Sequence, residues 1–88
     1  MNKNVTFSPD GWADYVYWQT EDRKTLKKIN SLIKDIIRNG VSEGMGEPEP
    51  LRYQEAWSRR IDQKNRLVYC VENDTLVVLS CKGHYDDK

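Results

Sequence analysis

The sequence lacks three features that would narrow its function at once: an excess of charge, a metal-binding cysteine motif and a long apolar run. Fourteen basic residues balance fourteen acidic ones, so net charge does not indicate a strongly basic nucleic-acid-binding protein. Cys70 and Cys81 have no ligand spacing, and we expect small buried side chains, no metal and no cofactor. No stretch resembles a signal peptide or a membrane span, which predicts a cytoplasmic protein without a membrane partner.

The length of the chain limits its organisation. Its 88 residues suffice for one small domain, which we expect to extend over residues 1–88. A domain of this size buries only about 60–65% of its unfolded surface. Three tryptophans, five tyrosines and one phenylalanine supply large side chains for this modest core. No internal repeat or low-complexity segment divides the chain.

The first forty residues predict a short strand followed by two helices. Residues 4–7 form the strand, Ser8 is a suitable N-cap, and Pro9 suits the first helical position. Thr20 is predicted to cap the second helix, which ends at Gly40. Apolar residues recur at helical spacing along the second helix: Leu26, Ile29, Leu32, Ile33, Ile36 and Ile37. This apolar stripe requires a sheet to cover it.

Glycine and proline dominate the loop over residues 41–50. Pro48 and Pro50 flank Glu49, and both prolines favour extended backbone before them. Glu49 is therefore predicted in a stiff, extended segment, and a strand is expected to start within residues 51–53.

Residues 57–61 and 66–71 predict a β-hairpin. A three-residue loop ending at a left-handed Asn65 would pair Asp62 with Arg66. One face would then carry Arg60, Arg66 and Val68. The core face would carry Ile61, Leu67, Tyr69 and Val71. A register slip of one residue would place the two arginines on opposite faces.

The last strand is predicted over residues 75–81, after a turn at residues 73–74. Its nearly continuous apolar run is typical of a strand buried on both sides. Strict alternation would send Tyr85, and not His84, to the face of Arg66. A bulge or kink at Gly83 would change this, so alternation leaves the direction of His84 open.

Glu49, Arg66 and His84 are the residue types that metal-free cleavage of RNA requires. The 2′-hydroxyl is an internal nucleophile, so Glu49 could remove its proton, Arg66 stabilise the phosphorane and His84 protonate the leaving 5′-oxygen. Each proton transfer contributes about 10²–10⁴-fold in rate, and cationic donors often contribute more. The ordinary pKa of glutamate is about 4.3, so partial burial would strengthen Glu49 as a base.

Each of these residues also has a simpler explanation. Loop glutamates are usually solvated, arginines on a sheet face often serve as ion-pair partners, and a single C-terminal histidine is often incidental. The basic residues of the second helix are typical of a solvated face, although they could meet RNA phosphates. The aromatic residues of the first helix are more typical of core than of base-stacking platforms: Trp12, Tyr15 and Trp18.

Taken together, the motifs resemble the YoeB/Txe family of toxin–antitoxin toxins, within the RelE/ParE group. The resemblance covers nearly the whole chain, from Trp12 to Tyr85. Its motifs occur in order at residues 12–19, 26–30, 44–51, 57–61, 66–69 and 84–85.

The resemblance implies an α+β fold, with two N-terminal helices packed on an antiparallel β-sheet in a microbial-ribonuclease-like arrangement. It implies a ribosome-dependent endoribonuclease that cuts mRNA in the A site and stops translation. The implied catalytic residues are Glu49, Arg66, His84 and Tyr85. The implied substrate-binding residues are Arg52 and Arg60. The implied partners are a cognate antitoxin, the ribosome and mRNA, with a homodimer left open.

Two other classes of function stay open beside the enzyme. One is a non-catalytic toxin of the same fold that binds a protein target such as DNA gyrase, and the other is a plain interaction module. The sequence departs from the family pattern at its C-terminal extension, residues 86–88. It also departs at Met45 and Glu47, where basic residues occur in relatives, and at Arg52, where lysine is common.

Overall fold

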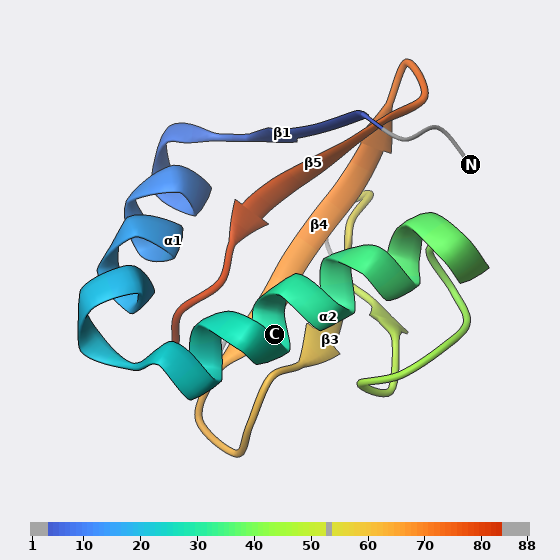
Figure 1. The fold of residues 1–88 in the computed structure, drawn as a ribbon. Coiled ribbons are helices and arrows are strands. Elements are labelled where there is room, and N and C mark those ends of the chain that lie inside the picture. The colour runs from blue at the N-terminus through green and yellow to red at the C-terminus, as the bar shows by residue number, and fades with distance from the viewer. Residues whose placement is uncertain (1–3, 53, 84–88) are drawn as a thin grey trace.

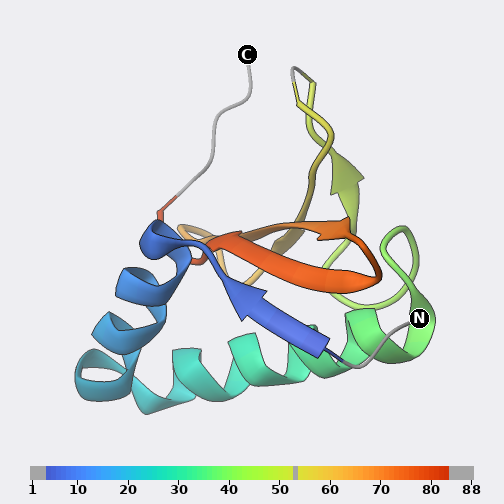
Figure 2. The same cartoon turned by 90° about the horizontal axis from the view of Figure 1, so that it is seen from above.

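Two helices cover one face of a five-stranded sheet in the computed structural model, which describes residues 4–52 and 54–83 (Figures 1 and 2). The elements are β1 (Asn4–Phe7), α1 (Pro9–Glu21), α2 (Arg23–Asn39), β2 (Glu49–Pro50), β3 (Trp57–Arg60), β4 (Arg66–Glu72) and β5 (Thr75–Ser80). The strand order is β1-β5-β4-β3-β2. This arrangement confirms the predicted α+β fold with two N-terminal helices on a sheet.

The sheet is mixed rather than wholly antiparallel. β1 pairs in parallel with β5, from Asn4 opposite Thr75 to Phe7 opposite Val78, while the other neighbouring strands are antiparallel. Parallel neighbours need a long crossover connection, and the helices together with the rest of the sheet separate β1 from β5 in sequence. Neither helix in the described ranges has the length and hydropathy that a membrane span requires.

The two helices meet at Asp22. Ser8 caps α1 as predicted, since its Oγ accepts a hydrogen bond from the Gly11 backbone N–H at 3.1 Å. The predicted cap at Thr20 is wrong, because α1 continues to Glu21 and Asp22 caps α2. The Asp22 carboxylate accepts from two backbone N–H groups of the first turn, whereas a threonine hydroxyl is a weaker acceptor.

The core lies between α2 and the sheet. The apolar residues of α2 follow the predicted period, and Ile29, Leu32 and Ile36 are fully buried. They face four fully buried sheet residues: Leu67, Tyr69, Leu76 and Val78.

The aromatic residues of α1 divide between core and surface. Trp18 is buried and its Nε1 donates to the Cys81 carbonyl at 2.8 Å. Tyr15 is half-buried, with its hydroxyl donating to Asn30 Oδ1. The prediction that Trp12 belongs to the core is wrong, because Trp12 is 54% exposed and packs edge-on against Phe7 at the surface.

The first hairpin has a longer loop than predicted. Arg60, and not Asp62, lies opposite Arg66, and Asn65 does not have the predicted positive φ. Asp62 closes the loop instead, with Oδ1 accepting from the Lys64 and Asn65 backbone N–H groups at 2.7 Å each. The register differs from the predicted one by two residues, so the side chains keep their faces.

The faces of β4 are therefore mostly as predicted. Arg60, Arg66 and Val68 share the face away from α2, while Leu67 and Tyr69 point into the core. The exception is Val71. It is 37% exposed near the end of β4, so its assignment to the core is wrong.

A bulge interrupts the second hairpin. Its turn is at Asn73–Asp74 as predicted, with φ of 49° and 60°, which is typical of a tight hairpin. Tyr69 pairs with Val78, yet Val68 pairs with Ser80, so the extra residue is Leu79. Alternation is thus shifted by one residue before Gly83 is reached. Only one side of β5 is fully buried, because Val77 and Leu79 are half-buried.

Candidate active site

Three strands bring the predicted site residues to the sheet face opposite α2. Glu49 on β2 lies opposite Ser58 on β3, and Arg60 on β3 lies opposite Arg66 on β4. Ser58 is also opposite Val68. A loop carboxylate and two arginines that are separate in sequence therefore meet around the buried Ser58.

Arg66 is the most enclosed of these charged groups. Its side chain is 11% exposed, and Nε donates to Ser58 Oγ at 3.0 Å. Its Nη2 is buried and has no hydrogen-bond partner among the described residues. A buried donor of this kind carries a penalty of about 1–3 kcal/mol, and a guanidinium fork matches anionic oxygens well. The geometry is suited to a phosphate oxygen.

Glu49 stands beside this guanidinium. Its Oε2 lies 3.9 Å from Arg66 Nη2, and its side chain is 65% exposed. The carboxylate is therefore open to a ligand. The extended backbone predicted for Glu49 is confirmed, although the strand covers Glu49–Pro50 and does not include Leu51 or Arg52; Tyr53 lies outside the described residues.

The other predicted residues are less well placed or lie outside the described residues. Arg60 is exposed and forms a loose ion pair with Glu47, with Nη1 and Oε1 3.5 Å apart. Arg52 is exposed after β2. His84 and Tyr85 are outside the described part of the chain.

Gly83, the last described residue before His84, lies next to Arg66. The Gly83 carbonyl accepts from the Arg66 backbone N–H at 3.0 Å. The Gly83 backbone N–H donates to Asn65 Oδ1 at 2.7 Å. These two bonds attach the last described residue to the start of β4, and φ of Gly83 is 86°.

Sequence reasoning missed Arg59, which organises the loop before Glu49. Arg59 is fully buried, and its guanidinium donates to the Tyr69 hydroxyl, to the Asp35 carboxylate and to three loop carbonyls. Those carbonyls belong to Gly40, Glu43 and Met45. The available signal was alternation, since Arg59 occupies a core-facing position between Ser58 and Arg60.

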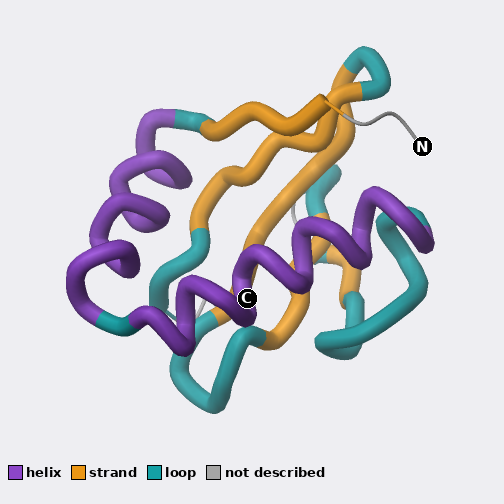
Figure 3. The backbone as a smooth tube through the Cα atoms, viewed as in Figure 1, coloured by secondary structure: helices purple, strands orange, loops and turns teal. Residues whose placement is uncertain are grey.

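The loop between α2 and β2 runs from the end of α2 back to the edge of the sheet (Figure 3), and three of its carbonyls accept hydrogen bonds from this arginine. Asp35 Oδ2 also accepts from the Met45 backbone N–H at 2.9 Å. Burial opposes ionisation of Asp35, but hydrogen bonds from Arg59 and Met45 hold its pKa below the ordinary value. A side chain at Gly44, where φ is 122°, would collide with the Asp35 carboxylate.

Burial also raises the pKa of Tyr69, whose hydroxyl joins Arg59 to the Val41 carbonyl. The loop is further bound to the hairpin, because the Arg60 backbone N–H donates to the Gly46 carbonyl at 2.7 Å. The segment that precedes Glu49 is thus held from both α2 and β3. Within the described residues there is no group of three or more potential metal ligands.

The sequence matches, over residues 7–85, the family described as "YoeB-like toxin of bacterial type II toxin-antitoxin system". Toxin YoeB of Escherichia coli K12 is 48% identical over 83 residues, covering 92% of this chain and 98% of that protein. Toxin YoeB of Streptomyces coelicolor has the same identity and coverage.

Solved structures agree with this match. A YoeB–YefM toxin–antitoxin complex from Staphylococcus aureus contains a chain 49% identical, with 93% and 97% of the two chains covered and a TM-score of 0.86. A YoeB/ParE toxin from Agrobacterium tumefaciens is 37% identical, with 93% and 99% covered and a TM-score of 0.87. The chain therefore belongs to the YoeB-like toxins of bacterial type II toxin–antitoxin systems.

Proposed function

We propose that this toxin is a metal-independent endoribonuclease that cleaves mRNA in the ribosomal A site and so inhibits translation. The observation that carries the proposal is the buried Nη2 of Arg66, which has no hydrogen-bond partner among the described residues and lies 3.9 Å from the Glu49 carboxylate. A cationic donor directed at a phosphate oxygen and an adjacent base are the groups that attack by a 2′-hydroxyl needs.

The proposed reaction begins with proton transfer from the 2′-hydroxyl to Glu49. The 2′-oxygen attacks the adjacent phosphorus, and the P–O5′ bond breaks to leave a 2′,3′-cyclic phosphate. Arg66 donates to the phosphoryl oxygens, where negative charge increases in the transition state. The family pattern assigns protonation of the leaving 5′-oxygen to His84, with Tyr85 positioning the substrate. Arg60 and Arg52 would contact flanking phosphates.

Neutral net charge supports a dependence on the ribosome. With fourteen basic and fourteen acidic residues, long-range attraction of free RNA is weak. We infer that the ribosome positions the message, because alignment of the reacting atoms can replace intrinsic affinity. This target places the action of the toxin in the cytoplasm.

The proposed protein partners follow from solved relatives. One structure from Staphylococcus aureus is a heterotetrameric YoeB–YefM toxin–antitoxin complex, and another is a YoeB dimer. We infer that this toxin binds a cognate antitoxin and forms a homodimer in its absence. The free toxin should therefore elute as a dimer in size-exclusion chromatography with light scattering.

The test replaces Glu49 with Gln and uses Glu47→Gln as the matched control. Both residues are exposed glutamates of one loop, but only Glu49 adjoins Arg66. With ribosomes paused on a model message, toeprinting should show A-site cleavage by the wild type and by Glu47→Gln. Single-turnover cleavage by Glu49→Gln should be about 10²–10⁴-fold slower.

The same experiment separates the competing functions. Growth arrest by the wild type with intact mRNA would contradict the nuclease and favour a toxin that binds a protein target such as gyrase. Equal cleavage by Glu49→Gln and the wild type would exclude Glu49 as the base.

A further inference from the structure

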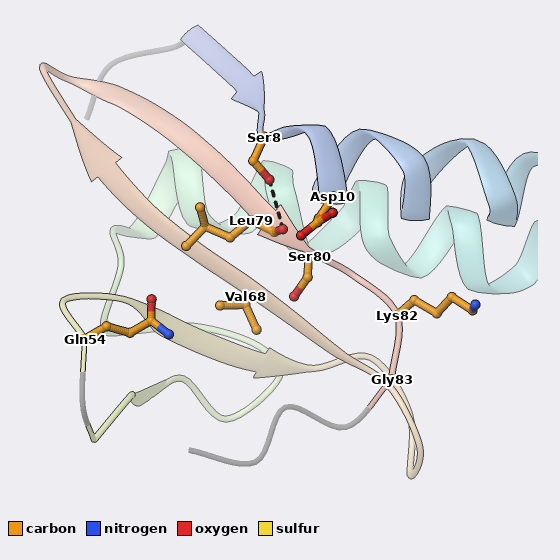
Figure 4. A pocket seen from close by; sticks show the side chains of 8 residues that line it. All are labelled: Ser8, Asp10, Gln54, Val68, Leu79, Ser80, Lys82 and Gly83. Atoms are coloured by element: carbon orange, nitrogen blue, oxygen red, sulfur yellow. Dashed lines mark hydrogen bonds between the residues drawn. The ribbon is translucent and has the colours of Figure 1, made fainter. Parts of the chain in front are cut away.

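A groove of about 490 Å³ adjoins the Arg66 site, and no step of the proposed reaction uses it (Figure 4). It lies between the start of α1, the end of β5 and the segment between β2 and β3. The lining residues used below are Asp10, Gln54, Val68, Leu79, Ser80 and Lys82.

The groove lies beside the proposed phosphate site along β4. Val68 lies two residues after Arg66 on the same face of β4, about 7 Å along the strand. It is only 2% exposed, yet it is outside the core cluster beneath the helices. Gly83 lines the groove while its carbonyl accepts from the Arg66 backbone N–H. A strand of RNA with one phosphate on Arg66 would present its neighbouring base here.

The chemistry of the groove suits a base better than a phosphate. Val68 and Leu79 supply apolar surface, while Asp10 and Ser80 face Gln54 across it (Figure 4). A carboxylate repels phosphate but accepts hydrogen bonds from amino groups.

The cation on the rim is engaged elsewhere. Lys82 extends away from the groove, and its Nζ lies 4.2 Å from the centroid of the Tyr17 ring. Ser8 is likewise occupied, since its Oγ donates to the Leu79 carbonyl and accepts from the Gly11 backbone N–H. Asp10 is exposed in the first turn of α1 and is, among the described residues that line the groove, the charged group that faces it.

We propose that this groove binds the nucleobase next to the cleaved phosphodiester, and that Asp10 selects bases with an exocyclic amino group. Adenine, cytosine and guanine offer such a donor, and uracil does not. Single-stranded RNA is commonly read in this way, through the edges of bases that are splayed out of the stack. The proposal deepens the proposed nuclease function and rests on it.

The first test measures discrimination on the ribosome. Messages would carry A, C, G or U at the A-site nucleotide next to the cut, and single-turnover cleavage would be compared for wild type, Asp10→Ala and Glu21→Ala. Glu21 is the matched control, because it is an exposed acid at the other end of α1. We expect Asp10→Ala to reduce the preference over uracil by roughly 5- to 100-fold, and Glu21→Ala to keep it. Unchanged discrimination in Asp10→Ala would overturn the proposal.

The second test needs no cleavage. The free toxin would be titrated with AMP, CMP, GMP and UMP while the backbone amide signals of Ser80 and Gly83 are followed by NMR. The three amino-bearing nucleotides should shift these signals at lower concentration than UMP, and Asp10→Ala should remove the difference. Selective binding without mRNA cleavage would refute the nuclease but keep the subsite. Cleavage with no base preference in either test would refute the subsite alone.

Discussion

Two arginines of one hairpin, Arg59 and Arg66, show how differently a buried guanidinium can be used. Arg59 faces α2 and makes five hydrogen bonds, including an ion pair with Asp35. Arg66 faces the opposite side, makes one side-chain hydrogen bond to Ser58, and leaves a buried Nη2 without a partner in the described chain. A buried donor that is hydrogen-bonded stabilises the fold, whereas an unsatisfied one costs free energy that a ligand could recover. The contacts of Arg59 are those of a structural residue, while Arg66 has the donor that the proposed function requires.

The largest effect is expected from Arg59→Ala. It removes a charge from a buried, fully bonded network and leaves Asp35 without its cation, which costs about 3–5 kcal/mol when a buried pair is broken. Urea unfolding should show this loss, and Arg59→Lys should recover only part, because lysine cannot reproduce the guanidinium fork. An unfolding midpoint equal to that of the wild type would show that the contacts of Arg59 do not stabilise the fold.

Arg66→Gln should show the opposite behaviour. Loss of a donor to the phosphoryl oxygens should slow A-site cleavage by about 10²–10³-fold, with a change in unfolding free energy of about 1 kcal/mol or less. Pull-down with a cognate antitoxin should be retained, which shows that the variant is folded. If Arg66→Gln instead unfolds as readily as Arg59→Ala, the contrast between the two arginines disappears.

The smallest expected effect is on the pH dependence of stability, through the carboxylate of Asp35. Its pKa is lowered in the fold by the hydrogen bonds from Arg59 and Met45, against the opposing influence of burial. Between this folded pKa and the unfolded value of about 3.9, the unfolded chain binds more protons, so stability falls as pH decreases through that window. Unfolding free energies measured with urea at several pH values should therefore decrease less at acid pH in Asp35→Asn than in the wild type. Some acid sensitivity should remain, because the pKa values of Asp22 and Asp62 are lowered too. Parallel pH profiles for wild type and Asp35→Asn would contradict the assignment.

The comparison also shows which parts of the fold could be predicted. The apolar period of α2 follows from helix geometry. The prediction that Arg60 and Arg66 share a face is correct although the predicted loop length is wrong, because a register error of two residues keeps each side chain on the same face of the sheet. The family pattern, rather than spacing, linked Glu49 to Arg66, and the pair lies together in the structure.

Three other features could not be predicted from the sequence. Asp22 prevails over Thr20 as a cap because its carboxylate accepts two backbone hydrogen bonds. The bulge at Leu79 arises in the pairing of β4 with β5. In the sequence Arg59 resembles any other charged strand residue, and its role becomes visible only from its hydrogen bonds to the loop carbonyls. Tertiary contacts decide the last two, whereas the choice of cap is local.

The contacts of Arg59 have a consequence for how this toxin can evolve. Its loop partners, at Gly40, Glu43 and Met45, are all main-chain carbonyls. Apart from Gly44, the contacts that fix the path of the loop do not use its side chains, so we expect that Glu43, Met45 and Glu47 can be substituted without moving Glu49. If the proposed nuclease function holds, mutation could change the charge of this loop while the proposed base, Glu49, stays in place.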